Sequence, residues 1–168
     1  EEGYLNDLVT EEGEPDPSVR PNQVYVLSLP FSLLDKTQEE KVLKTITETL
    51  YTPFGLRTLE IHNYKFKPNY SGDVWSRDAA YHQGTVWPFL LPEYYSAYLK
   101  VNGRSEASKR FVESELASLK QHFYESECLH GISEVFDGLE PKEGKGCIQQ
   151  AWSVSNLILL IMKEGLTV

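Results

Sequence analysis

The stretch AYHQGTVWPFLLPEYYSAYLKV, residues 80–101, joins a polar and aromatic loop to a strongly apolar segment. Its second part predicts a helix over 86–101 with Pro88 in the first turn, where a missing backbone N–H costs nothing. Thr85 is suited to be the N-cap, because its hydroxyl can accept from a backbone N–H of that turn. The helix therefore carries, at its N-terminal end, a loop of side chains with binding chemistry.

Helical spacing of apolar residues continues on both sides of this stretch. The further helices that it predicts cover 22–30, 37–51, 105–123 and 147–163. Thr37 and Glu40 match a capping box, while Pro30 and Gly165 mark helix ends. The apolar face of the helix over 105–123 is expected to consist of Ala107, Phe111, Leu116 and Leu119.

The connections between these helices are long. Residues 1–21 are expected to be irregular, since Glu, Gly, Asp and Pro dominate there. The loops over 54–84 and 131–146 are of a length that usually serves function. The fold class is therefore mostly α, with long loops alternating as in a helical toroid that places its site at one end.

Composition restricts the class of protein and its partners. A chain of 168 residues with 40% apolar and 12% aromatic residues predicts one globular domain over 1–168. The net charge of −9 and the absence of a basic run argue against a nucleic acid or an anionic membrane surface as partner. The longest apolar run, 157–162, is too short to span a bilayer. The chain opens without Met, and we expect it to be part of a longer protein.

The cysteines and histidines show no pattern of a metal or cofactor site. Cys128 and Cys147 form no CxxC motif, which indicates a reduced protein of the cytoplasmic type. The histidines lack metal-ligand spacing, and neither a phosphate-binding glycine loop nor a GxSxG motif occurs. We therefore expect no cofactor and no metal.

Two groups of residues have the chemistry of a sugar site. His82 and Gln83 offer donors and acceptors for hydroxyls, and Trp87 offers a flat face for the C–H side of a sugar ring. Trp152 opens the last helix and could wall the same pocket. A tryptophan at such a position more often packs in the core, and both interpretations stay open. Arg77, between Asp73 and Asp78, either orders the loop in an ion pair or orients a carboxylate or a sugar hydroxyl.

The stretch GISEVFDG, residues 131–138, holds two acids between glycines. A glycosidase places two carboxyl groups roughly 5 Å apart for retention, or roughly 6.5–9.5 Å apart for inversion. Glu134 and Asp137 lie three positions apart in one loop. Two acids so close in the chain rarely lie on opposite sides of a substrate. At most one of them belongs to an acid/base pair, and a solvated turn at Asp137 is the alternative.

Five segments taken together resemble the C-terminal part of the glycogen debranching enzyme family, its amylo-α-1,6-glucosidase domain. In chain order they are SVRPNQVYVLSLPFSLL, TPFGLRTL, YHQGTVWPFLL, ISEVFDG and GCIQQAWSVSNLI. The resemblance extends over about residues 3–163 and implies part of an (α/α)6 toroid. A complete toroid has more helices than the pattern provides, so the chain is expected to cover its C-terminal third to half.

The resemblance also implies a reaction and a set of site residues. The family hydrolyses the α-1,6-linked glucose at glycogen branch points with inversion, and Glu134 matches its general base. The general acid of the family lies in a Gly-Arg-Asp-Thr motif that this sequence lacks; Ser76-Arg77-Asp78 is a look-alike to which the role is not transferred. Asp137 is expected to orient the loop that holds Glu134. The residues expected to line the glucose subsite are Tyr81, His82, Gln83, Thr85 and Trp87, with Arg77 and Trp152 as weaker candidates.

Three expectations follow for the protein as a whole. The substrate is glycogen or another branched α-glucan, and the chain alone has little or no activity because the general acid lies upstream. Uncovered apolar helix faces lead to self-association. The alternatives are a non-catalytic helical module that binds α-glucan and another inverting α-glucosidase, such as a trehalase-like enzyme, on the same fold.

Overall fold

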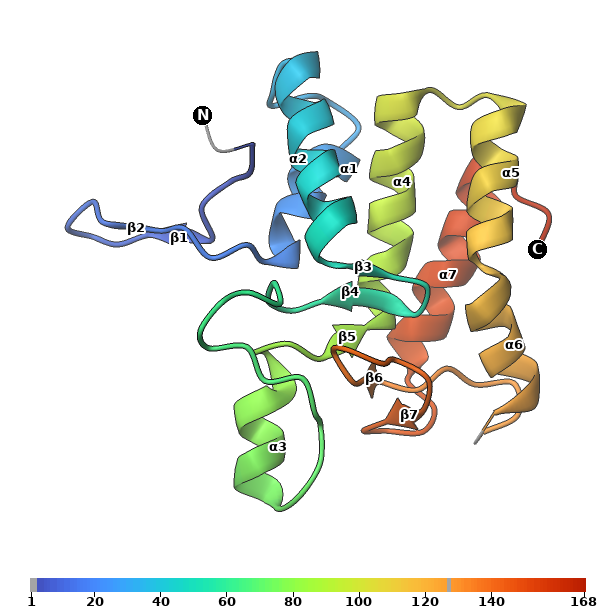
Figure 1. The fold of residues 1–168 in the computed structure, drawn as a ribbon. Coiled ribbons are helices and arrows are strands. Elements are labelled where there is room, and N and C mark those ends of the chain that lie inside the picture. Colours follow the sequence, from blue (N-terminus) through green and yellow to red (C-terminus); the bar gives the residue numbers. More distant parts are fainter. Residues whose placement is uncertain (1–2, 127) are drawn as a thin grey trace.

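The computed structural model describes residues 3–126 and 128–168. Helices stand beside one another on one side of a narrow sheet, and one short helix extends on the other side (Figure 1). The helices are η1 (Pro21–Gln23), α1 (Val24–Ser28), α2 (Lys36–Thr49), α3 (Val74–Tyr81), η2 (Pro88–Leu90), α4 (Leu91–Asn102), α5 (Glu106–Glu115), α6 (Ala117–Glu125) and α7 (Ala151–Glu164). The strands are β1 (Leu8–Val9), β2 (Pro15–Asp16), β3 (Tyr51–Thr52), β4 (Gly55–Arg57), β5 (Val86–Trp87), β6 (Val135–Phe136) and β7 (Gly144–Lys145).

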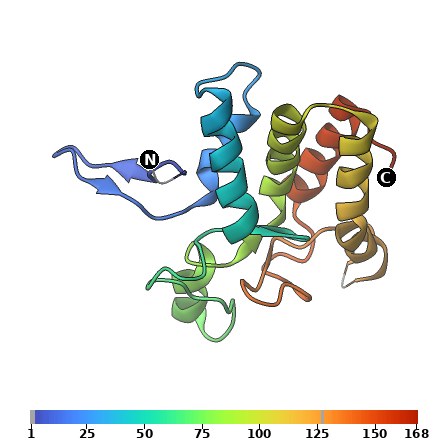
Figure 2. The ribbon, with the colours of Figure 1, turned by 45° about the horizontal axis from the view of Figure 1, so that its top comes forward.

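Helix α4 is the centre of the core. It contacts α1, α2, α5 and α7, and it buries its apolar and aromatic side chains among them (Figures 1 and 2). The buried side chains of α4 include Leu91, Tyr94, Tyr95, Ala97 and Leu99. Burial of this kind stabilises by about 25 cal/mol per Å² of apolar surface, so a helix buried on nearly all sides anchors the domain. The mostly α class is confirmed; the toroid stays a prediction.

The start of this helix differs from the prediction. The segment from Val86 first forms β5 and then η2, and α4 begins only at Leu91. Thr85 is not an N-cap: its hydroxyl donates to the Tyr81 carbonyl over 2.7 Å, and the residue is fully buried. Pro88 does begin a helical turn, as its fixed φ favours, but that turn is the 3₁₀ helix η2.

Helix α2 confirms the predicted face and corrects the predicted cap. Its apolar positions, Val42, Leu43, Ile46 and the following Leu50, are buried. The capping box is formed by Asp35 and Gln38, not by Thr37 and Glu40. The Asp35 carboxylate accepts from the Gln38 N–H over 2.9 Å, and the Gln38 side chain accepts from the Asp35 N–H over 3.0 Å. Asp is at least as good an N-cap as Thr, and it stands two residues earlier.

The C-terminal helices differ from the sequence pattern in their ends. The helix predicted over 105–123 is divided at Leu116 into α5 and α6. Phe111, expected on its apolar face, is 41% exposed, and Val112 is buried instead. Helix α7 begins at Ala151 rather than Cys147, and Gly165 ends it in the left-handed conformation with φ 64°, as predicted. None of the helices that the structure describes is of the length and apolar character that a bilayer crossing requires.

Short strands and one helix occupy the segments expected to be loops. Strands β3 to β7 pair antiparallel in chain order, so β5, before η2, lies beside β6 of the ISEVFDG segment. Strands β1 and β2 form a separate hairpin within residues 1–21 that extends away from the helices (Figure 2). Helix α3 lies within 54–84, and the Asp73 side chain caps it by accepting from the Ser76 N–H.

Candidate active site

Glu134 directly precedes β6, and its carboxylate is held from two sides. Oε1 accepts from the hydroxyl of Tyr81, the last residue of α3, and lies 3.5 Å from Nε2 of Gln150. Oε2 accepts from the backbone N–H of Cys147 over 2.9 Å. The Glu134 backbone N–H donates to the Cys147 carbonyl over 2.9 Å, so main chain and side chain are fixed by the same segment. The carboxylate is thereby set in one position between α3 and the start of α7.

The residue that allows this close approach is Gly146. A Cβ atom at this position would lie 2.5 Å from Oε2 of Glu134. The backbone of Gly146 has φ +72°, which side chains other than glycine rarely adopt. Both the conformation and the space therefore require glycine beside the carboxylate.

Tyr81 remains a hydrogen-bond donor to this carboxylate at neutral pH. The pKa of Tyr81 is raised well above its ordinary value of 10.0, mainly by partial burial and also by the hydrogen bond with Glu134. The ring packs edge-on against Trp87 with centroids 4.7 Å apart and against His82 at 4.9 Å. The phenol thus links the carboxylate to a group of aromatic side chains.

These aromatic side chains form a continuous stack from α3 to α7. His82 stacks on Trp87 with centroids 5.5 Å apart and an interplanar angle of 11°. Trp152, on α7, stacks on Phe89 at 4.4 Å and meets Trp87 at 5.9 Å. Trp87 is only 4% exposed, whereas Trp152 is 42% exposed. The exposed rings of the stack therefore belong to Trp152 and His82, whereas Trp87 packs behind them in the core.

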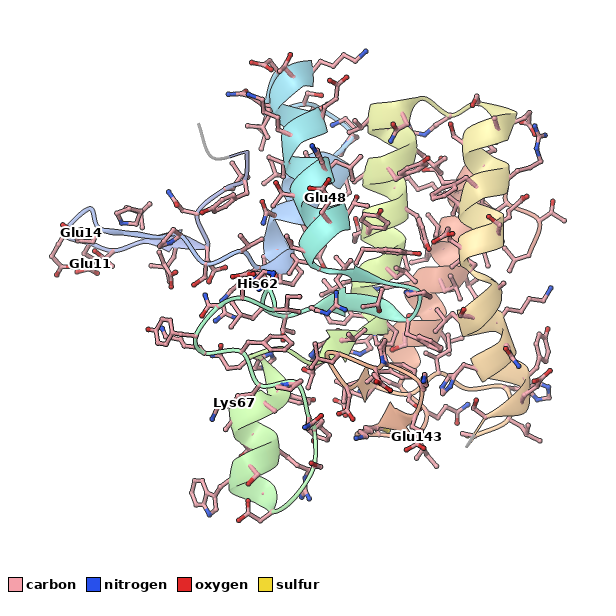
Figure 3. All side chains as sticks on the ribbon, viewed as in Figure 1. Glu11, Glu14, Glu48, His62, Lys67 and Glu143 are labelled. Atoms are coloured by element: carbon pink, nitrogen blue, oxygen red, sulfur yellow. The ribbon has the colours of Figure 1, made fainter. Side chains whose placement is uncertain are left out.

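A pocket of about 530 Å³ opens beside this stack. Of the predicted site residues, His82, Gln83, Trp87 and Trp152 line it, whereas Glu134 does not. The opposite wall comes from the β1–β2 hairpin and the segment after it. The lining residues on that wall are Asp7, Leu8, Asp16, Arg20, Pro21 and Asn22. Figure 3 shows Glu11 and Glu14 at the tip of the same hairpin, beyond the pocket.

The remaining predicted residues lie outside the pocket. Arg77 donates to the Gly72 carbonyl over 2.7 Å, which ties the start of α3 to its preceding turn. Asp137 accepts from the Tyr70 N–H over 2.7 Å and pairs with Lys145 on β7. Through these two contacts Asp137 holds the end of β6 against the segment around Tyr70 and against β7. Thr85 lies buried behind the stack, where its Oγ1 accepts from the Trp87 indole over 3.1 Å.

Sequence reasoning assigned no role to several residues of the site, although three of them lie in GCIQQAWSVSNLI, a segment that carries the resemblance. Cys147 acts through its backbone N–H, Gly146 through its lack of a side chain, and Gln150 through its amide. Arg20 contacts both His82 and Gln83 from far away in the chain. Arg20 lies in SVRPNQ, residues 18–23, which carries part of the resemblance, and this is the signal that could have identified it. Within the described residues, no three His, Cys, Asp or Glu side chains gather to hold a metal ion.

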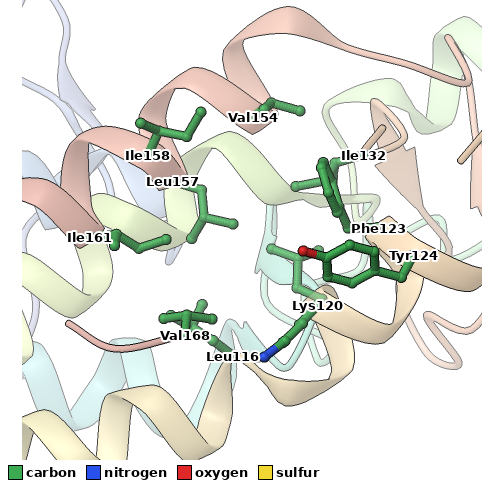
Figure 4. A pocket seen from close by; sticks show the side chains of 11 residues that line it. Leu116, Lys120, Phe123, Tyr124, Ile132, Val154, Leu157, Ile158, Ile161 and Val168 are labelled. Carbon is green, nitrogen blue, oxygen red and sulfur yellow. The ribbon is translucent and has the colours of Figure 1, made fainter. Parts of the chain in front are cut away.

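A second cavity, of about 160 Å³, lies between α6 and α7 and is apolar (Figure 4). Ile158 and Ile161 face it from α7, and Phe123 and Tyr124 from α6. Its lining includes neither Glu134 nor any other acid. We therefore interpret it as a gap in the packing of the two helices.

Glycoside hydrolases act with two carboxyl groups placed at the sugar, and the fixed carboxylate of Glu134 is compatible with one of them. Residues 1–159 match the family model described as amylo-alpha-1,6-glucosidase, and the chain belongs to that family. The glycogen debranching enzyme of Saccharomyces cerevisiae is a relative, 29% identical over 181 aligned residues. The alignment covers 93% of this chain and 11% of the yeast enzyme, so the chain spans about a tenth of the length of this relative.

Proposed function

We propose that this chain is the C-terminal part of a cytoplasmic debranching glucosidase, covering the last third to half of an (α/α)6 toroid. Its substrate is the α-1,6-linked glucose at the branch points of glycogen or a similar α-glucan, hydrolysed with inversion. The family membership and the name of the yeast relative support the substrate. The observation that carries the proposal is the fixed carboxylate of Glu134, held by Tyr81 and the Cys147 N–H beside the aromatic pocket.

Glu134 is the general base in this proposal. In an inverting glycosidase the base takes a proton from the water that attacks the anomeric carbon. A carboxylate has about four lone-pair directions. Tyr81 and Gln150 take the two at Oε1 and the Cys147 N–H takes one at Oε2, so Oε2 can still accept from a water. Because its position is fixed before substrate arrives, little reorganisation is needed when the proton moves.

The sugar is bound by His82, Gln83 and Trp152, with Trp87 and Thr85 supporting them. Arg77 and Asp137 hold the surrounding loops. The general acid is supplied from a part of the protein outside this chain, so the chain alone does not turn over substrate. The cytoplasmic location is supported by two free thiols, Cys128 and Cys147.

A non-catalytic glucan-binding module is the second candidate. One observation favours it. The pocket is lined by the aromatic stack and by residues between Asp7 and Asn22, which we call the N-terminal wall, but not by Glu134. In that case the pocket binds a chain end, and the carboxylate serves only to hold the segment around β6 in place.

The substitution Glu134→Gln in the complete enzyme separates the two candidates. General-base catalysis contributes about 10²–10⁴-fold, so kcat on a branched dextrin is expected to fall by that factor with KM little changed. Glu143→Gln is the matched control, because Glu143 is an exposed acid on the loop before β7 (Figure 3). The isolated chain is expected to show no turnover in the same assay. Near-normal turnover of Glu134→Gln would reject the general base and leave the binding module.

A further inference from the structure

Arg20 connects the N-terminal wall of the pocket to the loop before β5. One of its terminal nitrogens, Nη1, donates to the carbonyls of Thr58 over 3.0 Å and His82 over 2.7 Å. The other, Nη2, donates to Oε1 of Gln83 over 3.0 Å, and Nε lies 3.3 Å from Oδ2 of Asp7. The side chain is 17% exposed, so these contacts form in a partly dry environment.

This arrangement decides which end of the Gln83 amide faces a ligand. A guanidinium only donates hydrogen bonds, so Gln83 must present its oxygen to Arg20. The group left for a ligand is the amide NH₂, a donor of two hydrogens. Gln83 lines the pocket, and Nε2 finds no acceptor among residues 3–126 and 128–168. The pocket thus holds a donor of fixed identity.

The charges of the pocket favour a neutral ligand. Asp7 and Asp16 line it together with Arg20, which leaves one net negative charge when His82 is counted as neutral. Arg20 directs its nitrogens to protein acceptors and is not available to an anion. The Asp16 Oδ1 atom accepts from the Ser18 N–H over 2.9 Å, which leaves carboxylate oxygens of both acids as acceptors for hydroxyls.

We infer that Arg20 is a positioning residue that fixes Gln83 as a hydrogen-bond donor to a saccharide hydroxyl, and that Asp7 and Asp16 restrict the pocket to neutral saccharides and exclude sugar phosphates. The inference rests on the proposed function only in taking the ligand to be a saccharide. It assigns specificity to residues before α1, far in sequence from Glu134.

The test is isothermal titration of the complete enzyme carrying Glu134→Gln, so that the sugar is not consumed. The probes are isomaltose, which is neutral, and glucose 1-phosphate. One lost hydrogen bond corresponds to about a tenfold change in affinity, so Gln83→Leu and Arg20→Met are each expected to weaken isomaltose binding about tenfold. Arg20→Lys keeps the positive charge but loses the planar set of guanidinium donors. Its isomaltose affinity is expected to lie between those of the parent and of Arg20→Met. Arg110→Met, at an exposed arginine on α5, is the matched control and is expected to bind as the parent does.

A kinetic readout distinguishes positioning from a general loss of structure. With Glu134 intact, Arg20→Met and Gln83→Leu are expected to raise KM for a branched dextrin about tenfold while kcat changes less than about twofold. Thermal melts identify a variant that does not fold. If Arg20→Met does not fold, Gln83→Leu decides the matter, because the backbone contacts of Gln83 remain in that variant.

The phosphate arm tests the charge. Glucose 1-phosphate is expected to bind at least about tenfold more weakly than isomaltose, and the double variant Asp7→Asn, Asp16→Asn to narrow that difference. Unchanged isomaltose affinity in Gln83→Leu, absent isomaltose binding, or equal binding of the two sugars would overturn the inference. None of these results touches the Glu134→Gln turnover assay, so the proposed function stands or fails separately.

Discussion

Gly146 sets the distance between the β7–α7 connection and the Glu134 carboxylate. Its positive φ brings the chain around so that the Cys147 N–H reaches Oε2, and the lack of a Cβ leaves room for that oxygen. The position of the carboxylate therefore depends on a residue that has no side chain.

Gly146→Ala is expected to reduce both stability and activity. The left-handed conformation costs a side chain about 1–2 kcal/mol. The added Cβ would lie 2.5 Å from Oε2 and is expected to displace the carboxylate. A displacement of about 1 Å corresponds to roughly 10²-fold in turnover, measured as kcat of the complete enzyme. Gly13→Ala is the control: Gly13 has φ +87° with open space around it, so the same backbone cost is expected with activity retained. Equal activity of both variants would contradict this role.

At the residue scale, sequence reasoning singled out Glu134 and the aromatic group but not the contacts that hold them. Trp87 was expected either to offer a ring face or to pack in the core, and the structure buries it where β5 brings it against Trp152 of α7. Arg20 lies in a segment that carries the resemblance, but its role was not assigned, because its partners His82 and Gln83 lie 62 and 63 residues away and no local pattern encodes such a distance.

At the scale of elements, the capping box of α2 shows how a helix start is chosen between nearby polar residues. Asp35 has an extended backbone, φ −71° and ψ 164°, and its carboxylate reaches the Gln38 N–H. Thr37 lies inside the first turn, where its hydroxyl cannot cap. The negative charge of Asp35 is also favourable at the positive end of the helix dipole.

Asp35→Ala is therefore expected to destabilise the protein by about 1 kcal/mol. Thr37 was predicted to be the cap but is not. Thr37→Ala is therefore expected to change the free energy of unfolding by less than about 0.5 kcal/mol. Urea unfolding of the two variants measures the difference. An equal or larger loss in Thr37→Ala would contradict the cap seen here.

The strands show which elements a sequence pattern cannot reveal. The helices over 37–51 and 86–101 have enough turns for their periodicity to be recognised, and their existence was predicted. Strands of two or three residues, such as β5 and β6, contain one alternation at most. Their pairing depends on distant segments, and it is this pairing that brings Trp87 and Glu134 into one region.

At the scale of the whole molecule, α7 leaves an apolar side uncovered. Among its exposed side chains, Trp152, Leu159 and Met162 are 42%, 63% and 75% exposed. Contiguous apolar surface of this kind usually marks a contact with another surface. We expect the self-association of the chain to use this side of α7.

Met162→Lys combined with Leu159→Lys is expected to abolish that self-association. Light scattering over a range of concentrations should show a mass that rises for the parent chain and stays monomeric for the variant. Ala107→Lys combined with Ser114→Lys, at two exposed positions on α5, controls for the two added positive charges. A parent chain that stays monomeric at every concentration would refute the expectation.

The dependence of Glu134 on Cys147 and Gln150 has a consequence for biosynthesis. A ribosome makes the chain from the N-terminus, so Tyr81 and Glu134 are synthesised before Cys147 and Gln150. The carboxylate gains its partners 13 and 16 residues later, when that last helix docks. A nascent chain truncated before residue 147 would contain both the pocket loop and Glu134, but nothing on the C-terminal side to hold the carboxylate in place.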